Sequence, residues 1–359
     1  MGGGSRFLIY NNRNVIDAIK AMDYQYITTK DEMNNVTSGK VWAMFAPSAM
    51  AYEFDRLETA PHQPSLAEMT AKALHLLSQN KNGFFLMVEG SKIDWTAHAN
   101  DPIGLISDIL AFDAAVKVAL DFAKTNQNTM LLIMSDHGTG GLTIGSRDTQ
   151  DGHSKLPYDS AAIDNFIVPL TKARLTGEGI ATKLNQERTN IKEVMATWYG
   201  ISDLTAEEEA LIKSTAASRM NYAVGPMISK RAFLGWTTHG HTGQDVNLFT
   251  YLPGDGRITG TLDNTEIALI CAGVWGIDLQ AVTKQLFNDA EPAFRAKRAS
   301  VNINLETGQM TVTKGNNTLV IPDYKNYVFF NGIKVPINSV IVNQSGKFYV
   351  PQSVIDMIP

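Results

Sequence analysis

The chain has 359 residues, which is enough for two domains of roughly 150 residues each or for one large domain with an appendage. Hydrophobic residues make up 44% of the sequence and charged residues 19%, a globular composition that excludes a disordered tail, a collagen-like fibre and a coiled coil. The formal charge of −5, from 36 acidic against 31 basic residues, disfavours a nucleic-acid partner.

The same inventory excludes several kinds of site and anchor. The single cysteine, Cys271, cannot form an intramolecular disulfide or a thiolate metal cage, and we expect it to pack in an apolar stretch. The longest apolar runs, such as Phe84–Val88 and Met130–Met134, fall far short of the ~20 residues that cross a bilayer. The first residues show no signal peptide, and we expect a chain that starts so abruptly to be incomplete.

The first 80 residues predict short α/β units. Helical spacing of apolar residues marks Asn14–Met22, and two short runs, Tyr26–Thr28 and Val41–Phe45, are typical of strands. Ser65 and Glu68 have the spacing of a capping box, in which each side chain bonds the backbone N–H of the other residue. We therefore expect a helix to begin at this point.

Two apolar runs, Phe84–Val88 and Met130–Met134, are typical of strands covered on both faces. A long helix is expected between them, over Ile103–Lys124. This order of helix, buried strand, helix and buried strand predicts an α/β fold with a mostly parallel sheet flanked by helices.

The second half of the chain departs from this order. Residues 155–235 predict a helical insertion, after which we expect a strand at Val246–Leu252 and helices over residues 263–289. After about residue 300 the sequence is rich in Val, Ile, Asn and Thr, with repeated turn signals. We therefore expect an α/β domain over residues 1–290 and a small β-rich module over residues 300–359.

Polar side chains stand at the ends of the two apolar runs. Glu89 follows the first run, and Asp136 and His137 follow the second. Ligands of open α/β sheets bind outside the carboxyl ends of the strands, so these three residues lie where a site is expected. Taken alone, an Asp-His pair at a strand end can equally be a hydrogen-bonded loop element, and this alternative stays open.

Asp94 and His98 are four residues apart, which places a carboxylate and an imidazole on one side of a helix, within reach of one ion. A surface helix contact is the alternative. His241 comes much later, in a loop immediately before a strand. Three acids and three imidazoles without cysteine suit Zn²⁺, with Mg²⁺ at the all-oxygen end. Two metal ions about 4 Å apart would clamp the attacking and leaving oxygens of a displacement at phosphorus.

These residues lie in motifs that resemble those of the alkaline phosphatases. The resemblance runs from Met1 to about residue 290, with the motifs in the family's order. The motifs are Gly2-Gly-Gly4, Phe45-Ala-Pro47, Ser65-Leu-Ala-Glu-Met-Thr70, Val88-Glu-Gly-Ser-Lys-Ile-Asp94, His98-Ala-Asn-Asp-Pro102, Ser135-Asp-His137, Thr139-Gly-Gly141, His241-Thr-Gly243 and Asp263-Asn-Thr-Glu-Ile267.

Carried over by position, the resemblance implies two zinc ions and one magnesium ion. The implied ligands are Asp94, His98 and His241 for the first zinc, Asp136 and His137 for the second zinc, and Glu89 for the magnesium. The resemblance also implies hydrolysis of phosphate monoesters through a covalent phosphoserine. Nothing in the sequence shows this covalent step by itself.

The sequence departs from the family pattern at its beginning. In the family, a bridging aspartate and an Asp-Ser-Ala segment with the nucleophile precede the Gly-Gly-Gly motif, which here starts at residue 2. Asp159-Ser160-Ala161 has the right letters but follows Asp136-His137, so we interpret it as the start of the insertion. We therefore expect the nucleophile to be absent, the chain to correspond to the carboxyl-terminal two-thirds of an alkaline phosphatase, and its activity to be low.

Three smaller features leave alternatives open. Trp95 either tunes phosphate affinity or packs as an ordinary aromatic residue. His239 is either a solvent-exposed loop residue or one that supports or competes with the zinc ligands. The tail from about residue 315 weakly resembles small β modules related to the amino-terminal domain of copper amine oxidases, but it contains no histidine, so copper binding is not expected there.

The expected function is therefore phosphate monoester hydrolysis at a site with two zinc ions and one magnesium ion, by an alkaline-phosphatase-like enzyme. The alternatives are a catalytically inactive metal- or phosphate-binding surface protein and a phosphodiesterase of the same superfamily. Small phosphate monoesters are the expected partners, with a homodimer possible by resemblance. The resemblance also implies a secreted, periplasmic or cell-surface location.

Overall fold

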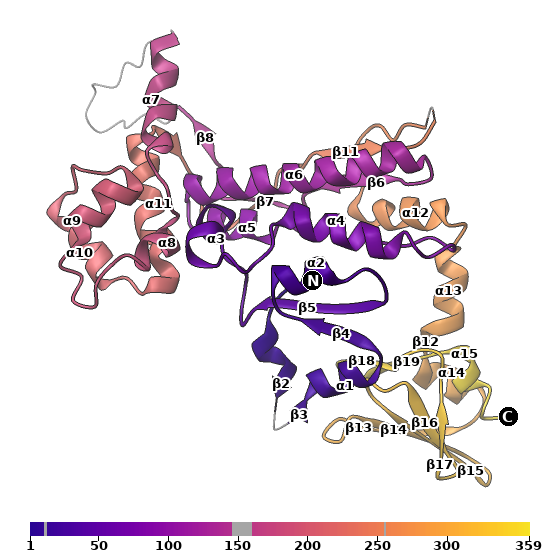
Figure 1. Cartoon of the computed structure of the whole chain (residues 1–359). Coiled ribbons are helices and arrows are strands. Elements are labelled where there is room, and N and C mark those ends of the chain that lie inside the picture. Colours follow the sequence, from indigo (N-terminus) through magenta and orange to yellow (C-terminus); the bar gives the residue numbers. More distant parts are fainter. Residues whose placement is uncertain (11–12, 146–159, 255) are drawn as a thin grey trace. The chain divides into compact units, whose positions relative to one another are not determined.

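The structure is a computed structural model, which describes residues 1–10, 13–145, 160–254 and 256–359 (Figure 1). It divides into two compact units, Met1–Ile258 and Thr259–Pro359. The first unit contains all the predicted metal ligands. The boundary expected between residues 290 and 300 stays a prediction, and the second compact unit begins earlier, at Thr259.

A parallel three-stranded sheet opens the first unit, in the order β1-β5-β4. The strands are β1 (Gly2–Gly3), β4 (Tyr24–Ile27) and β5 (Lys40–Ala46), with helices α1 (Val15–Ala21) and α2 (Lys30–Asn35) beside them. The expected helix and the two expected strands of this segment are confirmed within a few residues. Met33, Ala43 and Phe45 form the core between strands and helices.

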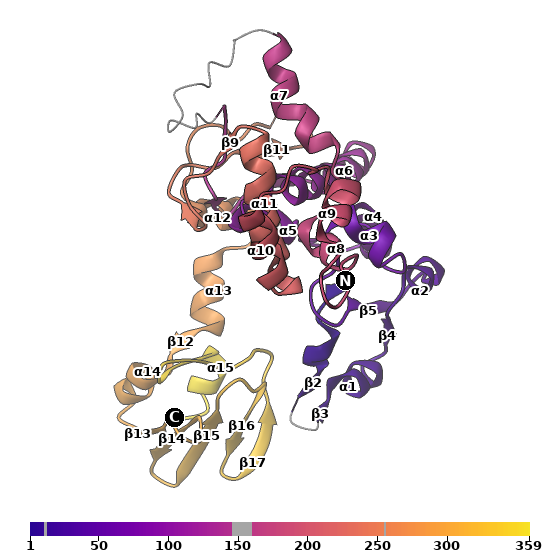
Figure 2. The ribbon, with the colours of Figure 1, turned by 90° about the vertical axis from the view of Figure 1, so that its left-hand side faces the viewer.

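A group of helices packs together next to this sheet, and one of them lies directly on it. Its members are α3 (Glu53–Thr59), α4 (Leu66–Leu77), α5 (Ser91–His98) and α6 (Pro102–Asn126). The capping box of Ser65 and Glu68 is confirmed at the start of α4, and the long helix expected over Ile103–Lys124 is confirmed as α6. Figures 1 and 2 show α4 between α6 and the sheet, and Met69 of α4 packs on the sheet's core.

Short antiparallel pairs complete the first unit. They are β2 (Ile9–Tyr10) with β3 (Arg13–Asn14), β6 (Leu131–Met134) with β11 (Leu248–Tyr251), β7 (Gly138–Thr139) with β10 (His241–Thr242), and β8 (Thr143–Ile144) with β9 (Leu234–Gly235). The strands expected at Met130–Met134 and Val246–Leu252 are thus confirmed as β6 and β11. The β6–β11 pairing places Leu248 opposite Met134 at the end of β6, and the β7–β10 pairing places His241 opposite Thr139.

The strand expected at Phe84–Val88 is wrong. Residues 83–90 form neither a helix nor a strand, and the exposure within the run alternates, with Phe85 and Met87 exposed and Phe84, Leu86 and Val88 half-buried. Phe84 packs edge-on against Phe122 of α6, with ring centres 6.0 Å apart. The run is therefore not covered on both faces, and a strand also needs a neighbouring backbone to bond with. Sheet pairing among the described residues does not include this run.

The insertion is helical, as expected, in the described part of residues 155–235. Its elements are α7 (Ser160–Thr171), α8 (Gly177–Ala181), α9 (Ile191–Val194), the π-helical turn η2 (Met195–Tyr199), α10 (Ala206–Ser214), η3 (Ala217–Arg219) and α11 (Met220–Arg231). Of the segment Asp159-Ser160-Ala161, Asp159 lies outside the described residues and Ser160 begins α7. Helices α8 to α11 gather at the N-terminal end of α6, where Ile103 joins their core (Figure 2).

The second unit is a β-rich module preceded by helices. Its helices are α12 (Asn264–Val274), α13 (Leu279–Leu286), α14 (Ala290–Ala296) and α15 (Gln352–Ile355). Its strands are β12 (Asn288–Asp289), β13 (Ser300–Asn304), β14 (Gln309–Lys314), β15 (Asn317–Pro322), β16 (Tyr327–Phe330), β17 (Ile333–Pro336), β18 (Val342–Gln344) and β19 (Lys347–Val350). Strands β13 to β17 form one antiparallel sheet in sequence order, and β12, β19 and β18 form a second.

The expected β-rich composition of the tail is therefore confirmed in the described residues. Among these residues no single helix is both long and apolar enough to cross a membrane. Helices α12 and α13 reach that length and composition only when taken together, and they meet at an angle of 93°.

Candidate metal centre

Helix α5 carries two of the predicted ligands on one side. Asp94 and His98 are one turn apart, and His98 Nε2 lies 3.4 Å from Asp94 Oδ1. The buried residues Thr96 and Ala97 hold the opposite side of the helix against the rest of the unit. Both side chains are partly exposed, so the carboxylate and the imidazole face an accessible space.

The pairing of β7 with β10 adds His241 to this pair. His241 lies opposite Thr139 in the antiparallel ladder, and its Nε2 is 3.9 Å from Asp94 Oδ1. Asp94, His98 and His241 each offer a ligand atom, and these atoms all lie within 4.8 Å of one another. One carboxylate and two imidazoles with an open side form the donor set typical of catalytic zinc sites. The residues present therefore fit a zinc ion.

His137 stands directly beside this group. Its ring stacks on that of His241, with centres 3.5 Å apart and planes 18° from parallel, and its Nε2 lies 3.4 Å from Asp136 Oδ2. The Asp136 side chain is 86% exposed, so it is open to a ligand or to solvent. Asp136 and His137, which follow β6, thus lie beside the group of Asp94, His98 and His241.

A threonine hydroxyl that we did not single out from the sequence joins the two groups. Thr139 Oγ1 donates to Asp94 Oδ1 at 2.7 Å and lies 3.1 Å from His137 Nδ1. Because the hydroxyl proton is committed to Asp94, the oxygen accepts from His137 Nδ1–H. With its proton on Nδ1, the His137 ring has its available lone pair on Nε2, which is the arrangement that a metal ligand requires.

Glu89 and Trp95, two further residues predicted from the sequence, lie outside this group of ligands. Glu89 is exposed in the segment before α5 and is not a member of the group whose ligand atoms converge among the described residues. Trp95 is 45% exposed, and the Lys92 ammonium lies 4.4 Å from its ring centre. Its expected role in phosphate affinity stays a prediction, and the packing alternative gains a partner in Lys92.

Lys92 anchors the buried side of α5. Its ammonium also lies 3.8 Å from the ring centre of Tyr52. Burial lowers the pKa of Lys92, while the carboxylates of Glu178, Asp108 and Asp55 favour its charged form. This cluster behind α5 fixes the helix whose other side carries Asp94 and His98.

Comparison with known proteins assigns the first unit to a family. The sequence model described as alkaline phosphatase matches residues 9–275, which is most of the chain. The chain belongs to the alkaline phosphatase family. A second model, the copper amine oxidase N-terminal domain, matches residues 278–358. Both resemblances noted in the sequence are therefore confirmed.

The alkaline phosphatase relatives agree with this assignment. "Alkaline phosphatase 4" of Bacillus subtilis is 34% identical over 274 residues, which cover 75% of this chain and 56% of the relative. The repressible alkaline phosphatase of Saccharomyces cerevisiae is 31% identical over 309 residues, covering 76% and 53%. The chain thus spans about half the length of the curated relatives that it matches.

A solved structure of the family supports the α/β fold. The cold-active alkaline phosphatase of a psychrophilic Shewanella species superposes with a TM-score of 0.63 at 28% identity. The match covers 77% of this chain and 64% of the Shewanella chain. The expected alkaline-phosphatase-like fold class is therefore confirmed.

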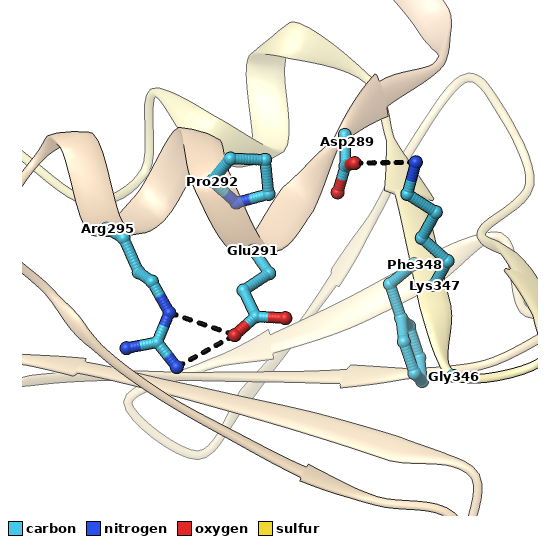
Figure 3. Close-up of a pocket in the computed structure, with 7 residues that line it drawn as sticks. All are labelled: Asp289, Glu291, Pro292, Arg295, Gly346, Lys347 and Phe348. Atoms are coloured by element: carbon cyan, nitrogen blue, oxygen red, sulfur yellow. Dashed lines mark hydrogen bonds and ion pairs between the residues drawn. The ribbon is translucent and has the colours of Figure 1, made fainter.

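The second unit contains a pocket whose acidic and basic side chains pair with one another (Figure 3). Its lining residues are Asp289, Glu291, Pro292, Arg295, Gly346, Lys347 and Phe348. Lys347 pairs with Asp289 at 3.1 Å, and Arg295 pairs with Glu291 at 2.7 Å. Because each charge in the lining is balanced by another, the pocket has no excess charge with which to select a phosphate or a metal ion.

Proposed function

We propose that this chain carries the metal centre of an alkaline phosphatase and takes part in the metal-dependent hydrolysis of small phosphate monoesters, with little selectivity for the leaving group. The observation that carries the proposal is the meeting of Asp94, His98 and His241 within 4.8 Å. One carboxylate and one imidazole come from α5 and the second imidazole from β10, and together they form a donor set suited to zinc.

The proposed ligand sets extend the cluster. Asp94, His98 and His241 would hold one zinc ion and Asp136 and His137 a second zinc ion. Glu89 would supply one carboxylate to a magnesium ion, whose other ligands the described residues do not place beside it. The stacking of His137 on His241 and the hydroxyl link through Thr139 support two neighbouring ions. When bound, the ions would supply Lewis acidity toward the phosphoryl oxygens.

The part played by this chain is to orient the donors. Hydrogen bonds to backbone and hydroxyl oxygens hold the protons of His98 and His137 on Nδ1, which turns both Nε2 atoms toward the metal side. The phosphoserine step of the family would need a nucleophilic serine in addition to the groups named here. No serine of this chain matches the position of that nucleophile, so we expect slow turnover from the chain itself.

Two other functions are outcomes of the test. One is a metal- or phosphate-binding surface protein without catalysis, and the other is a phosphodiesterase of the same superfamily. A secreted, periplasmic or cell-surface location and a homodimer belong to the proposal by family resemblance.

The test is hydrolysis of p-nitrophenyl phosphate at alkaline pH by the purified chain, with Zn²⁺ and Mg²⁺ added. We expect slow turnover that is lost in His241→Ala and kept in His75→Ala, which removes an exposed imidazole from α4. Faster hydrolysis of bis-p-nitrophenyl phosphate would support the phosphodiesterase instead. Zinc-loaded, folded protein that hydrolyses neither ester would contradict hydrolysis by this chain alone and leave it a metal-binding role.

A further inference from the structure

His239 and His98 hold each other through two reciprocal contacts. His98 Nδ1 donates to the backbone carbonyl of His239, and His239 Nδ1 donates to the backbone carbonyl of His98 at 2.8 Å. A carbonyl oxygen only accepts, so both Nδ1 atoms carry their protons. The two bonds join the last turn of α5 to the loop that leads into β10.

These contacts determine which ring nitrogen of His98 carries the available lone pair. With its proton on Nδ1, the ring presents Nε2 as an acceptor, and Nε2 is the atom that lies 3.4 Å from Asp94 Oδ1. His239 itself is outside the group of three whose ligand atoms converge. Its Nδ1 is already used by the bond to His98, so its position is that of a support for the ligands.

The loop is held on its other sides too. Gly240 accepts a backbone bond from Gly140 at 3.0 Å, and the ring of Tyr222 lies 6.1 Å from that of His239. The Asn100 amide, oriented to donate to the surrounding carbonyls, reaches Thr238 at 3.0 Å. His239 is the one member of this set whose side chain bonds directly to the backbone of a predicted zinc ligand among the described residues.

We propose that His239 is a positioning residue for the metal site: it fixes His98 and the loop before His241 so that the two imidazoles meet Asp94. The inference rests on the proposed function, because it assumes that the three residues bind zinc. Removing a group that orients a ligand typically weakens metal affinity 10- to 100-fold. His239→Ala keeps the backbone carbonyl that accepts from His98 Nδ1 but loses the side-chain bond that holds this carbonyl in place, so a weakening of the same size, about 10- to 100-fold, is expected.

His239→Asn is the conservative variant. The Asn side-chain NH₂ can take the place of Nδ1–H and donate to the His98 carbonyl, whereas Asn has no imidazole nitrogen to offer a metal ion in place of Nε2. His75→Ala is the matched control, because His75 is also exposed and its Nε2 also contacts a backbone carbonyl, that of Thr37 at 3.3 Å.

The experiment measures Zn²⁺ affinity of the full chain and its variants by competition with a chromophoric chelator, and then records the visible spectra of the Co²⁺-loaded proteins. We expect His239→Ala to lose affinity 10- to 100-fold, His239→Asn to recover most of it with an unchanged Co²⁺ spectrum, and His75→Ala to match the parent chain.

Three results would overturn the inference. Equal affinity of His239→Ala and the parent chain would show that the side-chain bond from His239 to the His98 carbonyl is not needed for zinc binding. An Asn variant as weak as the Ala variant, with a shifted Co²⁺ spectrum, would make His239 a ligand. A parent chain that binds no zinc, although folded, would remove the proposed function together with the inference, and this result differs from the other two.

Discussion

At the scale of single residues, Thr139 connects the two halves of the candidate metal centre. Its hydroxyl donates a hydrogen bond to Asp94 and accepts one from His137, so one side chain fixes the orientation of a carboxylate from α5 and an imidazole that follows β6. Its backbone also pairs with His241 in the β7–β10 ladder. The geometry of three predicted ligands, Asp94, His137 and His241, therefore depends on this threonine.

Replacing the hydroxyl alone tests this role. Thr139→Val keeps the β-branched shape and the backbone pairing but leaves His137 Nδ1–H without its acceptor. We expect zinc affinity to fall about 10-fold, since groups that orient ligands have effects of this size. Thr139→Ser should restore the affinity, measured by chelator competition. A Val variant that binds zinc as tightly as the parent would contradict the role.

At the scale of elements, α6 begins with a buried carboxylate. Asp101 is fully buried, and its Oδ1 accepts from the backbone N–H of Ile103 at 3.0 Å as the N-cap of the helix. Burial raises the pKa of Asp101 to about 7, and burial raises the pKa of Asp108, further along the same helix, to about 7 as well. The folded protein therefore takes up protons that the unfolded chain, with ordinary aspartates, does not.

The sign of the resulting pH dependence follows from linkage. The pKa of Asp101 is raised on folding, so the associated stability is complete below the unfolded pKa of about 3.8 and is lost as pH rises through about 7. Asp101→Asn keeps the cap oxygen and removes the charge. We expect the metal-free variant to melt at a higher temperature than the parent at pH 8 and to lose that advantage by pH 5.

The control is Asp113→Asn, which changes an exposed residue of the same helix. It should leave the difference in melting temperature between pH 8 and pH 5 as it is in the parent. Thermal unfolding followed by circular dichroism gives both values. A parent and an Asp101→Asn variant with parallel pH profiles would show that the carboxylate is charged equally in both states.

The sequence predicted some of these features and not others, for physical reasons. Helix periodicity and the i, i+4 spacing were sufficient for Asp94 and His98, because both follow from one local element. The approach of His241 depends on the long-range pairing of β7 with β10, for which the only signal was the family resemblance. The hydroxyl of Thr139 and the ring of His239 depend on side-chain orientation, which no spacing encodes.

At the scale of the whole molecule, the chain has two units with separate cores. The core of the second unit consists of residues between Ala290 and Ile358, with Phe294, Leu319 and Phe348 among its buried side chains. The alkaline phosphatase match ends at residue 275 and the copper amine oxidase match begins at residue 278, both ahead of this core. A closed core of this kind predicts that residues 259–359 fold when produced alone.

Phe294 tests this prediction, because it is completely buried in that core. In the fragment of residues 259–359, Phe294→Ala should cost about 3–5 kcal/mol of unfolding free energy, as buried aromatic truncations do. Phe287→Ala, in which the removed ring is 38% exposed, should cost clearly less. Urea unfolding measures both. A fragment without a cooperative transition, or equal effects of the two variants, would contradict the separate core.

The central claim is that Asp94, His98 and His241 bind one zinc ion. The most direct measurement is a crystal structure of the zinc-loaded chain with anomalous data at the zinc edge. We expect an anomalous peak about 2.0–2.2 Å from an Asp94 carboxylate oxygen and from Nε2 of both His98 and His241. Zinc bound at other residues, or a fully zinc-loaded crystal without a peak among these three side chains, would contradict it.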